Sequence, residues 1–179
     1  DDALSQRGRA PPEALSRAID RLAGALRFFT LADGRLAAFQ GGEAAPAARI
    51  AAARAQDASP TRPPETAPNG GYQRLQGQAV QVMVDAGPPA GGVFAVQACA
   101  QPLAIEIVCG RDRLIGGAGW SPDTDAPQAL RLSDAASTLC LAGASAGAPL
   151  AGWMAAVFGR RLSGASSRVE ARRHEGSEG

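Results

Sequence analysis

The chain has 179 residues, of which 45% are hydrophobic and 20% are charged, and its formal net charge is +1. This length suits one domain, and the apolar content is enough for a buried core, which excludes a wholly disordered chain. The 18 basic residues are all arginine and are interspersed with 17 acidic ones, so the sequence lacks the clustered positive charge of nucleic-acid and membrane-surface binding.

Targeting segments are not evident either. No apolar run approaches the roughly 20 residues of a membrane span, and no basic-then-apolar export signal is recognised. Because the sequence opens with Asp1 and not with methionine, we expect a fragment of a longer protein.

The first predicted element is a helix over residues 11–29. Pro11 and Pro12 suit a first helical turn, and the carboxylate of Glu13 suits its positive end. The next residues recur every three or four positions and form one apolar face: Leu15, Ile19, Leu22, Leu26 and Phe29.

The pattern changes after this helix. Asp33 and Gly34 separate two apolar runs, which predicts a hairpin turn. Residues 43–56 are rich in alanine and predict a short helix interrupted near Pro46. Residues 57–71 are rich in proline and glycine and predict a loop.

The remaining sequence predicts a mostly β, antiparallel sandwich, because short apolar runs alternate with turn signals. The predicted strands are 79–84, 94–100, 103–108, 113–115, 130–132, 137–141, 151–161 and 169–174, with a helix as the alternative for 151–161.

The cysteines Cys99, Cys109 and Cys140 are odd in number and form no C-x-x-C pair. This count predicts buried free thiols, although one pair could form a bridge. No cofactor or metal is predicted from the residues alone.

Two sets of residues suggest possible chemistry. Gly143 to Gly147 match G-x-S-x-G, so Ser145 could be a nucleophile with His174 as a distant base, or the segment could be a flexible glycine loop. His174, the only histidine, otherwise belongs to a solvated tail, and Tyr72, the only tyrosine, suits a strand start better than a catalytic base. The glycine cluster at 116–119 matches no phosphate-binding motif.

A second set would suit acidic sugars. Trp120 and Trp153 could stack on sugar rings, although core packing is the alternative for both. Three arginines would then face the negative charges of the sugars: Arg111, Arg113 and Arg131.

Three stretches of this sequence resemble the heparinase II/III family of polysaccharide lyases. The first contains Leu26-Arg27-Phe28-Phe29 and Asp33-Gly34-Arg35-Leu36-Ala37. The second joins Gly71-Tyr72-Gln73-Arg74-Leu75 to Val84-Asp85-Ala86-Gly87-Pro88-Pro89. The third runs from Gln97 to Gly119 and continues to Ser137-Thr138-Leu139. Their order and spacing cover most of residues 1–141.

The resemblance implies an α/α toroid joined to an antiparallel β-sandwich that breaks uronate polysaccharides by β-elimination. Such chemistry needs a base and an acid near neutral pH, usually His and Tyr, and some members hold a zinc ion. In this sequence the family's histidine positions match Gln97, Cys99 and Ala136, and a further polar position matches Gly117. None of these is carried over as a catalytic or metal-binding residue.

The expected organisation is the end of a helical region at 1–29 followed by an incomplete heparinase II/III-like β domain at 30–179. We expect a lyase-derived β domain that is catalytically inactive, or alternatively a non-catalytic glycan-binding or scaffolding module. Acidic polysaccharide and the missing helical toroid are the expected partners. The resemblance would place the protein in the bacterial periplasm or cell envelope.

Overall fold

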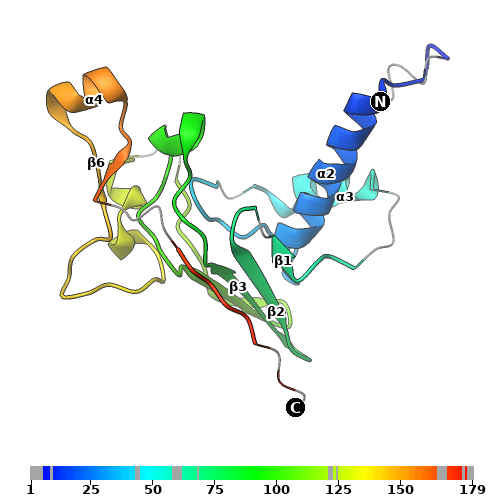
Figure 1. Ribbon diagram of the computed structural model, residues 1–179. Coiled ribbons are helices and arrows are strands. Elements are labelled where there is room, and N and C mark those ends of the chain that lie inside the picture. The colour runs from blue at the N-terminus through cyan, green and yellow to red at the C-terminus, as the bar shows by residue number, and fades with distance from the viewer. Residues whose placement is uncertain are drawn as a thin grey trace.

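The computed structural model describes residues 6–8, 10–42, 45–57, 62–67, 69–120, 123, 125–164, 169–174 and 176. This part of the chain forms three α-helices, an open five-stranded antiparallel sheet and a two-stranded ribbon (Figure 1). The antiparallel β class with an N-terminal helix is therefore confirmed, and the open sheet is consistent with the expected sandwich. None of the described helices is long and apolar enough to cross a membrane.

Helix α2 spans Glu13–Phe29 and confirms the helix predicted at 11–29. Pro12 is its N-cap, and the side chain and N–H of Thr30 both donate to the carbonyl of Leu26 where the helix ends. Phe28 is fully buried, whereas the apolar face nearer the N-terminus is exposed at Leu22 and its neighbours. Only the C-terminal end of α2 is therefore packed into the core.

Helix α3 spans Ala47–Ala55 and begins after Pro46, within the range predicted for it. The turn predicted at Asp33 and Gly34 is also present, with Gly34 at φ +79°. Only Thr30 and Leu36 pair across it, because α2 occupies the residues that would have extended the first strand.

The main sheet has the strand order β1-β2-β3-β4-β5, and each neighbouring pair is antiparallel. The strands are β1 (Thr66–Ala67), β2 (Tyr72–Gln76), β3 (Val80–Asp85), β4 (Ile105–Cys109) and β5 (Asp112–Ile115). Strands β3, β4 and β5 confirm three predicted strands. Strand β1 lies in the segment predicted as a loop, of which residues 58–61 and 68 are outside the described residues.

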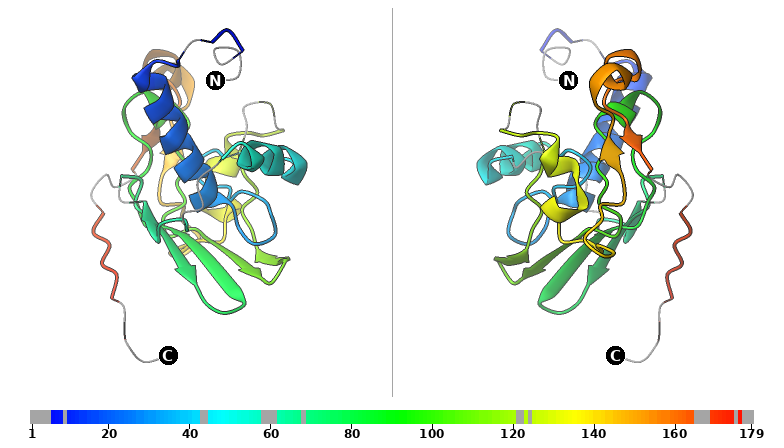
Figure 2. Two further views of the ribbon diagram at one scale, coloured as in Figure 1. Left: turned by 90° about the vertical axis from the view of Figure 1, so that its right-hand side faces the viewer. Right: turned by 90° about the vertical axis from the view of Figure 1, so that its left-hand side faces the viewer.

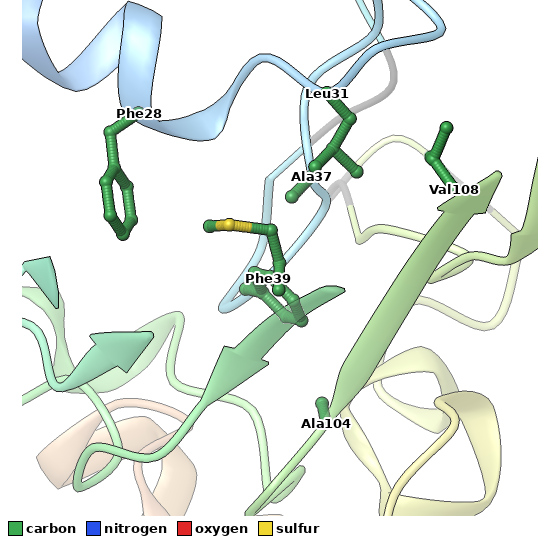
Figure 3. Close-up of a cluster of buried hydrophobic side chains, with 7 residues drawn as sticks. Phe28, Leu31, Ala37, Phe39, Ala104 and Val108 are labelled. Atoms are coloured by element: carbon green, nitrogen blue, oxygen red, sulfur yellow. The ribbon is translucent and has the colours of Figure 1, made fainter. Parts of the chain in front are cut away.

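The hydrophobic core lies between one face of this sheet, the end of α2 and the following loop (Figure 3). Alternation along β3 and β4 directs Met83 and Val108 into it. Phe29 also makes an edge-to-face contact with Tyr72, with ring centroids 5.0 Å apart. The buried members of the cluster are Phe28, Leu31, Ala37, Phe39, Met83, Ala104 and Val108.

Several predicted strands are wrong. Residues 94–100 begin in the 3₁₀ helix η1 (Gly92–Val96), and residues 130–132 overlap the 3₁₀ helix η2 (Ala129–Arg131). Gly92 starts η1 at φ +60°. The apolar side chains of η1 face solvent, and no strand pairs with it. Residues 137–141 contribute only an isolated bridge at Leu141. The 3₁₀ helix η3 (Ser133–Ala135) precedes them.

The C-terminal third differs most from the prediction. Residues 151–161 contain helix α4 (Gly152–Phe158), so the helical alternative is correct and the strand is wrong. A ribbon of β6 (Ala148–Pro149) and β7 (Leu162–Ser163) connects the ends of α4 to the body. No strand is assigned at 169–174, where the side chain of Arg173 holds the chain to Glu65 through an ion pair of 2.8 Å.

Candidate functional site

Three of the four positions that match the family's site lie around one loop, residues 38–42. Cys99 hydrogen-bonds to Gln40 of this loop, and Gly117 packs against the carbonyl group of Ala38. The carbonyl group of Gln97 lies beside Gly41. Ala136 is separate and packs against the hydrophobic core. The fold therefore brings the matched positions together only in part.

Gln40 is at the centre of this site. Its φ of +47° is in the left-handed region, which few residues other than glycine adopt. Its Oε1 accepts a hydrogen bond from the N–H of Cys99 at 3.0 Å, and its Nε2 donates to Asp85 at 2.9 Å and to the Cys99 carbonyl at 3.3 Å. These bonds satisfy both ends of the amide and offset a backbone cost of about 1–3 kcal/mol.

Burial controls ionisation here. Cys99 is 1% exposed, and burial raises the pKa of its thiol to about 11. Burial also raises the pKa of Asp85, although hydrogen bonds to its carboxylate oppose the shift. Burial, followed by the charge of Asp85, raises the pKa of the Tyr72 hydroxyl. Neither the thiol nor the phenol is thus the neutral-pH base that β-elimination requires.

The residues at the matched positions do not fit a zinc ion. Gln97, Gly117 and Ala136 offer no thiolate, imidazole or carboxylate, and the thiol of Cys99 keeps its proton. In the described ranges, no three His, Cys, Asp or Glu side chains are close enough together to bind a metal.

A cavity of about 220 Å³ adjoins Cys99 and Gln40. Its other walls are small or apolar and include Pro89, Pro102 and Val169. Cys99 is the only ionisable side chain among the described residues that line it. The cavity therefore offers no charge to neutralise a sugar carboxylate.

A buried ion network stabilises the same loop from the other side. Arg113 makes a bidentate pair with Asp33, at 2.8 and 3.0 Å, and a third bond of 2.9 Å to the fully buried Glu106. The second oxygen of Glu106 accepts hydrogen bonds from the N–H groups of Ala38 and Gly117. Burial alone would raise the pKa of Asp33, but its bonds to Arg113 lower it below the usual value.

The position of Gly117 has a steric explanation in this network. A Cβ atom there would lie 2.8 Å from the Ala38 carbonyl oxygen and 3.0 Å from the Glu106 carboxylate. The site thus has room for glycine and not for the larger polar residue that the family resemblance implies.

Arg131 and Trp120 are also buried and do not face a sugar. Arg131 is 0% exposed, lies 5.3 Å from the Trp120 ring, and donates to the carbonyl groups of Ala98 and Arg160 and to the side chain of Gln128, each at 2.8 Å. Of the residues proposed to bind sugars, only Arg111 and Trp153 are exposed. They lie on the β4–β5 turn and on α4, at opposite ends of the molecule (Figure 2).

Ser145 and His174 occupy different surroundings. The Ser145 hydroxyl accepts a hydrogen bond from the N–H of Ser133 at 3.0 Å and lies 3.2 Å from the Ser133 hydroxyl. His174 instead lines a cavity beside Leu75 and Val84. No hydrogen bond joins Ser145 to His174 within the described residues. The G-x-S-x-G segment begins in a turn that the Leu141–Ala144 bridge closes.

Sequence reasoning missed Gln40 and Glu106 as organising residues. A signal for Glu106 was present, since it is a single acid at a core-facing position in the apolar strand β4. Gln40 gave no comparable signal, because its partners are 45 and 59 positions away in the chain.

Comparison with known proteins identifies the family. The sequence model of the heparinase II/III-like C-terminal domain matches residues 59–179. The chain is also 55% identical, over 175 residues, to the FtsZ-localized protein C of Caulobacter vibrioides. That alignment covers 98% of this chain but 30% of the relative. No solved structure matches the chain. The chain therefore belongs to the heparinase II/III-like C-terminal domain family.

Proposed function

We propose that this chain is a non-catalytic module that has kept the heparinase II/III-like β domain and serves to bind FtsZ. The observation that carries the proposal is the buried cluster of Gln40, Asp85 and Cys99, in which Cys99 takes the place of a family histidine. Its groups are hydrogen-bonded to each other, and the thiol pKa is raised to about 11. A site with these properties is part of the packed interior and does not transfer protons at neutral pH.

The choice of partner follows from the relative. A protein named for its localisation with FtsZ is 55% identical to nearly the whole of this chain, although the chain spans less than a third of that protein. Acidic polysaccharide is supported less well, because Trp120, Arg113 and Arg131 are engaged inside the fold. The two exposed candidates, Trp153 and Arg111, are too widely separated to form one sugar subsite.

The test is binding of the purified chain to immobilised C. vibrioides FtsZ, measured by biolayer interferometry. We expect saturable binding with a Kd in the micromolar range, as for transient interfaces. Heparin, heparan sulfate and alginate, immobilised in parallel, should retain no more chain than an uncharged dextran control. Absence of FtsZ binding together with retention on an acidic glycan would contradict the proposal.

A further inference from the structure

A groove lies under helix α4, away from the family's site. It encloses about 670 Å³ between α4, the β6–β7 ribbon and η2. This volume is within the range of binding pockets, and most of its wall is apolar. Its lining includes Gln128, Leu132, Leu150, Ala155 and Arg160.

The backbone holds this groove open. Helix α4 runs between Gly152 at φ +57° and Gly159 at φ +74°, so its short length is set by two left-handed glycines. The Leu150 N–H donates to the Arg161 carbonyl at 2.8 Å and closes the loop that carries α4. The groove is thus part of the fold and does not need a ligand to form.

Arg131 fixes the floor of the groove from below. Its Nη1 donates at 2.8 Å both to the Gln128 side chain and to the Arg160 carbonyl, and both residues line the groove. The guanidinium is buried, and none of the described carboxylates forms an ion pair with it. A buried cation therefore lies directly behind this wall.

The lining adds one more cation. Arg160 lines the groove and is exposed, and neither it nor the adjacent, exposed Arg161 forms an ion pair within the described part of the chain. None of the described residues that line the groove is acidic. The lining therefore carries a positive charge without a counter-charge of its own, which favours an anionic partner.

The outer surface beside the groove is apolar. Trp153 is 72% exposed on α4, and Phe94 is 66% exposed on η1. The two elements are neighbours, since a Cβ at Gly159 would lie 2.7 Å from Val96 Cγ1. Exposed aromatic side chains beside a concave site are typical of binding surfaces.

We propose that this groove binds a short peptide segment in which apolar side chains lie next to carboxylates. The apolar side chains enter the groove beside Ala155, and a carboxylate pairs with Arg160. The inference deepens the proposed function, because FtsZ would supply the segment. A peptide fits better than a membrane, since a concave wall can be filled by side chains and not by a flat bilayer.

The experiment uses fluorescein-labelled 15-residue peptides that tile C. vibrioides FtsZ, with a sequence-scrambled version of each. Fluorescence anisotropy measures their binding to the whole chain. At least one peptide with adjacent apolar and acidic residues should bind more tightly than its scrambled form. Arg160→Glu should weaken that binding about tenfold or more, because it replaces attraction by repulsion. The control Arg111→Glu makes the same charge change at the β4–β5 turn and should leave binding unchanged.

A second variant tests the groove itself. Ala155→Trp should fill the apolar space and abolish peptide binding, and circular dichroism should show an unchanged fold. If Ala155→Trp misfolds, Arg160→Glu by itself still tests the proposal. The exposed Arg160 side chain makes no described hydrogen bond, so its replacement should not disturb the fold.

Failure of the groove and failure of the proposed function can be told apart. FtsZ binding that persists in both variants, or that occurs although none of the peptides binds, would show that the groove is not the binding site. The proposed function would then still stand. A peptide that binds while whole FtsZ does not would support the groove and contradict the FtsZ proposal. A third outcome is binding to phosphatidylglycerol vesicles that is abolished by Trp153→Ser and not by Ala155→Trp. This result would identify a membrane-binding face and contradict the proposal of a peptide ligand.

Discussion

Replacing Arg113 by alanine is expected to lower the free energy of unfolding by about 3–5 kcal/mol. Arg113 is the only cation bonded to the buried Glu106 among the described residues, and it also pairs with Asp33. Without it, two carboxylates are left buried or nearly buried without a counter-charge. Chemical denaturation followed by far-UV circular dichroism would measure the loss.

Arg111→Ala is the matched control. Arg111 is exposed two positions earlier, and no described ion pair involves it. This variant should remain within about 0.5 kcal/mol of the wild-type chain. Equal effects of the two substitutions would mean that the network around Glu106 does not stabilise the fold.

The second large effect is expected for Gly87→Ala. A Cβ at Gly87 would lie 2.2 Å from the carbonyl oxygen of Gly70 and 3.1 Å from the Cα of Gly71. Both neighbours are backbone, so the strand-end segments that carry them must separate. We expect a loss of about 3 kcal/mol or more in the free energy of unfolding, or failure to fold.

Gly91→Ala provides the comparison. A Cβ at this position meets no atom within 4 Å, and its φ is not positive. The substitution should leave the midpoint of thermal unfolding within about 2 °C of the wild-type value. If Gly87→Ala behaved in the same way, the close approach of the two glycine segments would be wrong.

The Gly87 contact explains one of the motifs that identified the family. The glycines before β2 and after β3 touch because Tyr72 pairs with Asp85 in the register of the sheet. Sequence could find this motif and the alternation of β3 and β4, since both are local patterns. It could not show that Gly71 and Gly87 were in contact.

Two of the wrong strand predictions have the same physical cause. Short apolar runs at 94–100 and 130–132 have no periodicity that distinguishes a strand from a 3₁₀ turn. A strand also needs a ladder of hydrogen bonds to a neighbour, and neither segment belongs to a described sheet, although the Ala100 N–H donates one bond to the Arg131 carbonyl. For α4, two left-handed glycines set the ends of the helix, and their φ values are not encoded in the apolar pattern.

The candidate site was only half accessible to sequence reasoning. The family resemblance located Gln97, Cys99 and Gly117 and showed that the titrating side chains are replaced. That Cys99 belongs to a closed hydrogen-bond network depends on Gln40 and Asp85, whose contacts are long-range. The burial of Arg131 and Trp120 was equally inaccessible, because both could have been surface residues.

Thiol labelling tests most directly whether the family's site has become part of the packed interior. The folded chain would be treated with N-ethylmaleimide at pH 7.5, and modification would be read by peptide mass spectrometry. We expect the exposed Cys140 to be modified, and the buried Cys99 to remain a free thiol until guanidinium unfolds the chain. Modification of Cys99 in the folded chain at a rate near that of Cys140 would contradict this account.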